Sequence, residues 1–144
     1  MQRCFMNITI IDGQGGQLGA QLVKEISSKF PDINLTAIGT NAVATATMLK
    51  AGAETAATGE NSVLVACRKA DVIMGPVGIV IADSLLGEIT DKMAVAIGQA
   101  DATRILLPMN KCDNLIAGVP DLSTKALIAD AISKLHIIID NCKY

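Results

Sequence analysis

The sequence predicts an α/β fold, a three-layer sandwich in which helices cover a mostly parallel sheet of five or six strands. Short apolar runs rich in Ile, Leu and Val alternate along the chain with stretches of helical periodicity. These apolar runs are continuous, which is typical of strands buried on both faces of a parallel sheet. No internal repeat and no low-complexity linker divides the 144 residues, so we expect one domain over residues 1–144.

The first half of the chain predicts two strands that are each followed by a helix. An Ile-rich run ends in a cluster of glycines, after which Leu18, Leu22 and Ile26 recur at the spacing of a helix with one buried face. Pro31 ends this helix, because proline cannot continue the helical hydrogen bonds. The expected elements are a strand at 5–12, a helix from 18 to about 30, a strand at 33–38 and an Ala-rich helix at 42–50.

The second half repeats this alternation less clearly. Its most hydrophobic run lies between Asp71 and Asp83 and is too short to span a bilayer. Thr90 or Asp91 is a suitable cap for one helix, and a Ser or Thr begins the last one. The expected elements are a short strand at 54–58, a helix at 60–69, a strand at 71–75, an apolar helix from 79 to about 90, a helix at 91–100, a strand at 104–109, an edge strand at 115–119 and a helix at 123–135.

The composition excludes several classes of function. The net charge is −2 and only 18% of the residues are charged, so the chain lacks the basic excess that neutralises nucleic-acid phosphates. Aromatic residues make up 2%, so the side chains on which bases stack are missing too. We therefore expect no nucleic acid and no membrane among the partners. Because 51% of so small a chain is hydrophobic, we expect copies of it to cover part of its surface in a homo-oligomer.

Four cysteines are scattered singly along the chain, at positions 4, 67, 112 and 142. They form no CxxC motif and have no neighbouring His, so neither a zinc site nor a disulfide framework is indicated and no metal ligands are predicted. The first residues lack the long apolar stretch and the small-residue cleavage site of a signal peptide. The simplest interpretation is a reduced, cytoplasmic protein.

Small and polar residues follow the predicted strands at the edge where their carboxyl ends meet. In an open parallel sheet, the ligand crevice lies beyond this edge, whereas the turns at the opposite edge of this sheet are ordinary solvated ones. The asymmetry predicts a binding site. Its candidate cofactor-binding residues are Asp12, Gly13, Gln14, Gly15 and Gly16 after the first strand, Thr40 and Asn41 after the second, Asn61 after the third, and Asn110 and Lys111 after the fifth.

The glycine loop after the first strand is the sharpest of these signals. Gly13 and Gly15 allow a tight turn, and the helix that follows directs its N–H groups and the positive end of its dipole at an anion. A strand, a glycine loop and a helix in this order indicate a Rossmann-like domain with a phosphate site. The match to the dinucleotide motif is imperfect, because Leu18 takes the third glycine position and Gly19 follows one residue later. The alternative, that the glycines only make a tight turn, is ranked behind phosphate binding.

Two further departures concern charge around this loop. The acidic residue that usually holds a ribose at the end of the second strand is replaced by Thr40 and Asn41, which can still bond a ribose hydroxyl or a phosphate oxygen. Asp12 would repel a phosphate unless it holds Mg²⁺ or takes a ribose hydroxyl instead. Lys111 is the only cation among the candidates, with a solvated loop lysine as the equal alternative.

Asp83 and Glu88 are the acid–base candidates, because they stand in a predicted helix that is otherwise almost entirely apolar. Ser84 and Glu88 would share one helix face, and apolar surroundings raise the pKa of a carboxyl group. A polar stripe that faces water or a partner subunit is an interpretation of equal weight. His136, the only histidine, lies far from every predicted strand end.

Several runs taken together resemble one specific family. The chain resembles small single-domain bacterial proteins, mostly from anaerobic Firmicutes, that are described as a domain of unknown function. The resemblance spans most of residues 6–119, and an anaerobic cytoplasm agrees with unpaired cysteines. It implies no activity. The runs that carry it are IDGQGG at 11–16, GTN at 39–41, ATGEN at 57–61, DVIMGP at 71–76, IADSLLGEIT at 81–90 and NKC at 110–112.

The leading hypothesis is a Rossmann-like protein that binds a nucleotide, such as NAD(P) or an adenine nucleotide, or another phosphorylated small molecule. No nucleophile and base stand out as a pair, so the sequence leaves open whether the protein is an enzyme. One alternative is a structural protein that assembles as a homo-oligomer without a nucleotide. The second alternative is an NAD(P)-dependent oxidoreductase in which Asp83 and Glu88 exchange protons.

Overall fold

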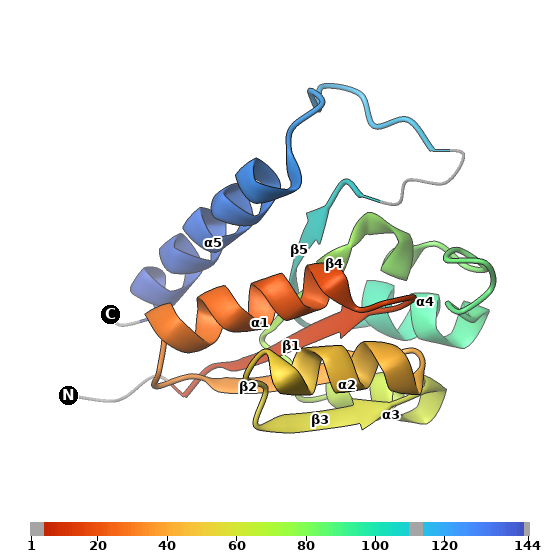
Figure 1. Cartoon of the computed structure of the whole chain (residues 1–144), viewed down its shortest axis with the longest axis horizontal. Helices are drawn as coiled ribbons and strands as arrows, with labels where there is room; N and C mark the ends of the chain where they lie inside the picture. The colour runs from red at the N-terminus through yellow and green to blue at the C-terminus, as the bar shows by residue number, and fades with distance from the viewer. Residues whose placement is uncertain (1–4, 110–113, 143–144) are drawn as a thin grey trace.

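The computed structural model describes residues 5–109 and 114–142, and its five parallel strands form one sheet (Figure 1). The strand order is β3-β2-β1-β4-β5, the order of a Rossmann-like sheet, so the predicted fold class is confirmed. In chain order the elements are β1 (Asn7–Asp12), α1 (Gln17–Lys29), β2 (Asn34–Gly39), α2 (Ala42–Lys50), β3 (Thr55–Thr58), α3 (Glu60–Cys67), β4 (Val72–Pro76), the 3₁₀ turn η1 (Val77–Val80), α4 (Asp91–Gln99), β5 (Thr103–Leu107) and α5 (Thr124–Asn141).

Helices cover both faces of the sheet, and each face has its own hydrophobic cluster. On one face, Ile8, Ile10 and Met74 of the central strands pack against α1, α2 and α5. On the other face, Ile11 and Ile73 pack against α3, α4 and η1. Neighbouring residues of a strand point to opposite faces, so strands with apolar residues at every position need cover on both sides. Figure 1 shows the first of these layers, with α1 and α2 in front of the sheet.

The carboxyl ends of all five strands lie at one edge of the sheet. The strand order reverses between β1 and β4, because β1 leads through α1 to β2 on one side and β4 leads through α4 to β5 on the other. Two backbone bonds join the loops at this edge: Thr40 N–H donates to the Asp12 carbonyl at 3.0 Å, and Gly59 N–H donates to the Gly39 carbonyl at 2.9 Å. The loops after β1, β2 and β3 are thus held side by side, at the place where sheets of this kind bind ligands.

The predicted helix from 79 to 90 is wrong. The chain makes the turn η1 and then a compact loop over 81–90, which we call the Glu88 loop. Within it, Asp83 N–H donates to the Ile89 carbonyl at 2.7 Å, and Ile89 N–H donates to the Ser84 carbonyl at 3.3 Å. These two hydrogen bonds close the loop on itself, and neither has the i to i−4 spacing of an α-helix.

The backbone of the Glu88 loop explains why periodicity failed there. Asp83, Leu85 and Leu86 have φ values of 65°, 55° and 57°, which a right-handed helix does not allow. Leu85 and Ile89 are both buried, at 1% and 0% exposure. Their separation of four residues has the spacing of a helix, although the chain between them is a loop.

Two other expectations near the C-terminus need correction. No strand forms at 115–119, where Gly118 has a φ of 78° and Leu115 is 97% exposed. The last helix does not end at 135, because α5 continues to Asn141 and buries Ile139. Its start is as expected, since the Ser123 hydroxyl accepts from Ala126 N–H at 3.1 Å.

The cysteines that the structure describes differ from each other. Cys67 is a buried free thiol, and burial raises its pKa to about 11. Cys142 takes part in a disulfide bond, so the expectation of unpaired cysteines is wrong for this residue. None of the helices within 5–109 and 114–142 has the length and apolar character that crossing a bilayer requires.

Candidate functional site

The glycine loop between β1 and α1 is a tight turn over the ends of the central strands. Gly16 N–H donates to the Gly13 carbonyl at 2.9 Å, which closes the turn. Gln14 and Gly16 lie in the left-handed region, with φ values of 50° and 74°. Gln14 and Gly15 are exposed, whereas Gly13 and Gly16 are buried. The loop therefore presents its middle to solvent and its two ends to the protein.

The Asp12 side chain stabilises this loop by hydrogen bonds to its backbone. Its carboxylate is 3% exposed and accepts from Gly13 N–H at 2.8 Å through one oxygen and from Gly19 N–H at 2.7 Å through the other. Burial raises the pKa of this carboxyl above its ordinary value of 3.8, against the two N–H groups that lower it, and the charge of Glu88 raises it further. Among the described residues, no group of three or more His, Cys, Asp or Glu could hold a metal ion.

Gly19 has the structural role of the third glycine of the dinucleotide motif, one residue after that glycine's usual position. A Cβ at this position would lie 2.6 Å from Met48 Sδ and 2.9 Å from Asp12 Cβ. The missing side chain therefore lets α1 lie close to both the end of β1 and α2. Leu18, which takes the usual position in the sequence, is buried in the core.

Glu88 reaches the glycine loop from a distant part of the chain. Its Oε2 accepts from Gln14 N–H at 2.7 Å, from Thr40 Oγ1 at 2.6 Å and from Asn41 Nδ2 at 3.1 Å. Partial burial raises the pKa of this carboxyl, but the hydrogen bonds from Thr40, Gln14 and Asn41 outweigh burial, so the pKa lies below its ordinary value. The raised pKa that apolar surroundings would give an acid–base residue is therefore absent here.

Thr40 and Asn41 connect the end of β2 to this cluster. The Asn41 side chain caps α2, where its Oδ1 accepts from Ala44 N–H at 2.8 Å, and its Nδ2 donates to the Gln14 carbonyl at 3.0 Å. The same Nδ2 contacts Glu88. Since the cap fixes the Asn41 amide group, its Nδ2 stays directed at the glycine loop, and Thr40 Oγ1 donates to the same Glu88 oxygen. We call Gln14 N–H, Thr40 Oγ1 and Asn41 Nδ2 the donor cluster.

The start of α1 has further donors next to this cluster. In the part of the chain that the structure describes, no protein group accepts from the N–H groups of Gly15 and Gln17, and both residues are exposed. Gly16, the residue before the helix, makes no side-chain cap. These two N–H groups lie at the positive end of a helix of 13 residues, where an anion is stabilised.

The structure brings only some of the other predicted residues to this place. Asp83 is exposed, and within the described chain its hydrogen bonds join it to Gly87 and Ile89 of its own loop, not to the donor cluster or to Glu88. Ser84 is buried and donates to the Gly78 carbonyl. Asn61 is exposed in the first turn of α3, with no hydrogen bond to the loops after β1 and β2. Asn110 and Lys111 lie outside the described residues.

The place of Glu88 is the functional feature that sequence reasoning missed. The sequence predicts Glu88 as half of an acid–base pair on a helix, not as a partner of Gln14, which lies 74 residues away. A hint was present in Gly87, whose φ of 87° is one that glycine adopts readily and that ends a helix. A glycine directly before a lone carboxylate in an apolar run is compatible with a loop.

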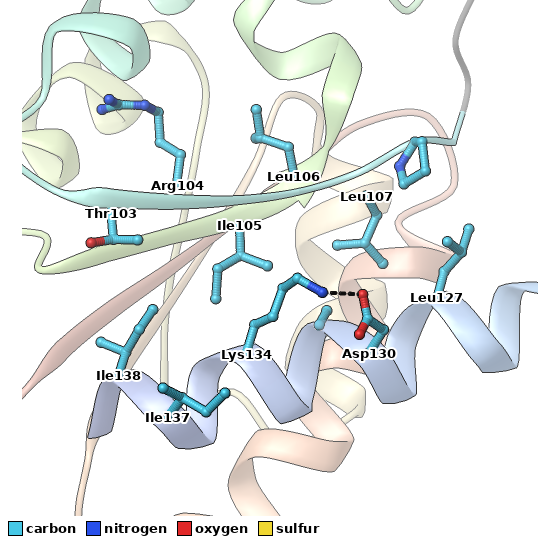
Figure 2. A pocket seen from close by; sticks show the side chains of 12 residues that line it. Thr103, Arg104, Ile105, Leu106, Leu107, Leu127, Asp130, Lys134, Ile137 and Ile138 are labelled. Atoms are coloured by element: carbon cyan, nitrogen blue, oxygen red, sulfur yellow. Dashed lines mark hydrogen bonds and ion pairs between the residues drawn. The ribbon is translucent and has the colours of Figure 1, made fainter. Parts of the chain in front are cut away.

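The described chain also has an apolar groove at the outer edge of the sheet, between β5 and α5. Its volume is about 550 Å³. Figure 2 shows Thr103, Ile105 and Leu107 pointing from β5 toward α5, where Lys134 and Asp130 form an ion pair. The groove lies away from the donor cluster and has an apolar floor, so it does not resemble a phosphate site.

Comparisons with known proteins give a family and a distant structural likeness. No curated protein matches the chain. Among solved structures, a dodecameric FMN-dependent UbiX-like decarboxylase from Escherichia coli O157:H7 is 12% identical, with a TM-score of 0.47 over 92% of this chain and 95% of that chain. A likeness of this size carries no argument about function. The expected resemblance to an uncharacterised family is confirmed by sequence: the model described as a domain of unknown function (DUF3842) matches residues 7–140, and the chain belongs to this family.

Proposed function

We propose that this protein binds a phosphorylated small molecule through its phosphate group at the glycine loop. A nucleotide is the first candidate for this ligand. The observation that carries the proposal is the set of donors at one end of α1. Within the described chain the N–H groups of the exposed residues Gly15 and Gln17 have no acceptor, and they follow Gln14 of the donor cluster, which already holds a carboxylate oxygen. Backbone N–H groups at a helix start suit phosphate, because their partial charges add to the helix dipole.

The rest of a nucleotide would extend from the glycine loop toward the ends of β2 and β3. Thr40 and Asn41 are placed to bond a ribose hydroxyl if they release Glu88, and Asn61 lies farther along the same edge. Asn110 and Lys111, which follow β5 in the sequence, remain candidate contacts for the same ligand. Asp12 supports the loop in this proposal, because both of its oxygens already accept from backbone N–H groups.

This arrangement favours binding over chemistry. NAD(P) and adenine nucleotides both present phosphates that fit the loop, and an NAD(P)-dependent oxidoreductase remains the first enzyme class to consider. The lowered pKa of Glu88 weakens the acid–base pair on which that class would depend, as do the hydrogen bonds of Asp83, which join it to Gly87 and Ile89 of its own loop. We therefore propose a binding or regulatory protein.

A thermal-shift screen tests the proposal directly. The purified protein is heated with NAD(H), NADP(H), ATP, ADP, AMP, FAD and S-adenosylmethionine, with and without Mg²⁺. A ligand present at about one hundred times its Kd stabilises the fold by about 2.7 kcal/mol, which raises Tm by roughly 5–10 °C for a chain of this length. If none of these ligands, with or without Mg²⁺, shifts Tm, the nucleotide proposal is wrong.

Substitution of Gly15 locates the bound phosphate. A Cβ at Gly15 would meet only Gln17 Cγ, at 3.9 Å, so a side chain fits there without disturbing the loop. We expect Gly15→Asp to weaken ligand binding by about tenfold or more, because it places a negative charge beside the phosphate. Gly15→Asn has nearly the same shape without the charge, and we expect it to bind within a few-fold of the native protein. Equal binding by both variants would place the ligand elsewhere.

Assembly as a homo-oligomer is the second candidate function, and the apolar groove between β5 and α5 favours it. Ile137, which lines this groove, is 59% exposed. Exposed apolar surface of this kind is often covered in oligomers. We expect light scattering at micromolar concentration to give a mass above that of the monomer, and Ile137→Glu to lower it. A monomeric native protein would contradict this candidate without affecting the phosphate proposal.

A further inference from the structure

The Glu88 carboxylate occupies the position that an anionic ligand would take. Its Oε2 accepts at 2.7, 2.6 and 3.1 Å from the three groups of the donor cluster. The same oxygen would lie 2.5 Å from a Cβ on Gly13, so the missing side chain at this position makes room for it. One oxygen with three donors around it is the environment that a phosphate oxygen finds in a binding loop.

A phosphate and the Glu88 carboxylate cannot share this position. Both are negative, both need the same donors, and the buried Asp12 carboxylate beneath the loop adds a third negative charge nearby. Like charges at such separations repel strongly in a partly buried site. An anion that enters the loop must therefore displace Glu88 from Gln14, Thr40 and Asn41.

The Glu88 loop is built so that the carboxylate can leave. Its base is anchored, because Leu85 and Ile89 are buried and the Thr90 hydroxyl donates to Glu60 Oε2 at 2.6 Å. Its tip is free of such packing, since Leu86 is 97% exposed and Gly87 has nothing within 4 Å of where a Cβ would stand. Glu88 itself is only partly buried, so rotation of its side chain moves the carboxylate into solvent.

We propose that Glu88 is an internal competitor for the anion site, an autoinhibitory contact that a phosphate-bearing ligand must expel. This inference rests on the proposed function, because it assigns regulation to the same loop. The proposal predicts that the native protein binds phosphate more weakly than a protein whose donor cluster is not occupied by Glu88. If Glu88 holds the donors in at least nine-tenths of the molecules, the apparent Kd is raised about tenfold or more.

Binding of ADP and of inorganic phosphate to four proteins tests the proposal by calorimetry. The native protein is compared with Glu88→Gln, which keeps the shape and removes the charge, and with Glu88→Ala, which removes the side chain. Asp91→Asn is the matched control, because it neutralises an exposed carboxylate three residues away whose hydrogen-bond partner among the described residues is Lys92 N–H. We expect both Glu88 variants to bind both probes about tenfold tighter, and Asp91→Asn to bind within about twofold of the native protein.

Each other result overturns the proposal in a distinguishable way. Equal affinity of the native protein and both Glu88 variants would mean that Glu88 does not compete, while the phosphate site stands. Weaker binding of ADP by the variants would make Glu88 a ligand contact, for example to a ribose hydroxyl. Absence of binding by all four proteins would reject the phosphate site and the internal competitor with it. Finally, adding Gly15→Asp to Glu88→Gln must abolish the gain in affinity, because otherwise the gain arises outside the glycine loop.

Discussion

Gly16→Ala is expected to destabilise the protein by about 3 kcal/mol, whereas Gly15→Ala, one residue earlier, is expected to change stability by less than about 0.5 kcal/mol. Gly16 has a φ of 74°, a conformation that costs any other residue roughly 1–2 kcal/mol. A Cβ there would also lie 2.7 Å from both the Cα and the carbonyl oxygen of Ala44. Backbone atoms at the start of α2 cannot rotate away as a side chain could, so the two helices must separate.

Urea unfolding of the two variants beside the native protein measures this difference. Gly15 is the matched control, because a Cβ there meets nothing nearer than 3.9 Å and the residue is exposed. A free-energy difference of 3 kcal/mol corresponds to roughly a hundredfold change in the unfolding equilibrium. Two variants of equal stability would mean that the close contact between Gly16 and Ala44 does not exist in solution.

The contrast between these glycines also shows why the sequence predicts the loop but not its details. The order of strand, glycines and helix predicts a tight turn, and the structure confirms that turn at residues 13–16. Nothing in the local sequence distinguishes Gly15, which is open to solvent, from Gly16, which touches α2. That distinction depends on Ala44, which the fold brings close from 28 positions away.

The elements that were predicted well are those whose buried face can be recognised from one segment alone. Leu18, Leu22 and Ile26 mark α1, and all three are buried. The helix expected at 42–50 has the bounds of α2. Strand β4 is equally recognisable, because burial on both faces makes it apolar throughout, whereas the edge strand β3 has Thr at both ends and gives a weaker signal.

The Glu88 loop was predicted incorrectly because its buried apolar residues have the spacing of a helix although the chain between them is irregular. Leu85 and Ile89 fill the space between the loop and the sheet, and their separation matches one turn of a helix. The positive φ values of Asp83, Leu85 and Leu86 could not be read from residue types that usually avoid them. Contacts across long stretches of the chain hold these residues in place, and a window of neighbouring residues does not contain that information.

In the candidate site too, some residues could be predicted from the sequence and one could not. The glycines, Thr40 and Asn41 were found because strand ends in a parallel sheet share an edge, a rule that needs only the order of the elements. The position of Glu88 over this edge depends on how the Glu88 loop closes after β4. The sequence thus predicts which donors gather, and the structure adds the anionic side chain that they hold.

Asp12→Ala is the second substitution with a large expected effect, a loss of about 2–4 kcal/mol in the free energy of unfolding. The native carboxylate accepts from the N–H groups of Gly13 and Gly19, and all three residues are buried. Removing the acceptor leaves two buried donors without partners, each at a cost of about 1–3 kcal/mol, partly offset because a buried charge is also removed. Asp12→Asn keeps one acceptor of similar shape, and we expect it to lose less than the alanine variant.

The pH dependence of these variants separates the buried charge from the hydrogen bonds. Burial raises the pKa of Asp12 above 3.8 in the folded protein, so the folded state holds the proton more tightly than the unfolded state between these two pKa values. Stability contributed by Asp12 must therefore fall as pH rises from 3.8 through the raised pKa, and then become constant.

Asn does not titrate, so the stability advantage of the native protein over Asp12→Asn is expected to be largest in acid and smaller at neutral pH. Urea unfolding of both proteins from pH 3 to pH 7 gives this difference, and an advantage that grows with pH would show that the two N–H groups outweigh burial and lower the pKa. Glu88→Gln should reduce the pH dependence, because the charge of Glu88 is one of the causes that raise the pKa of Asp12.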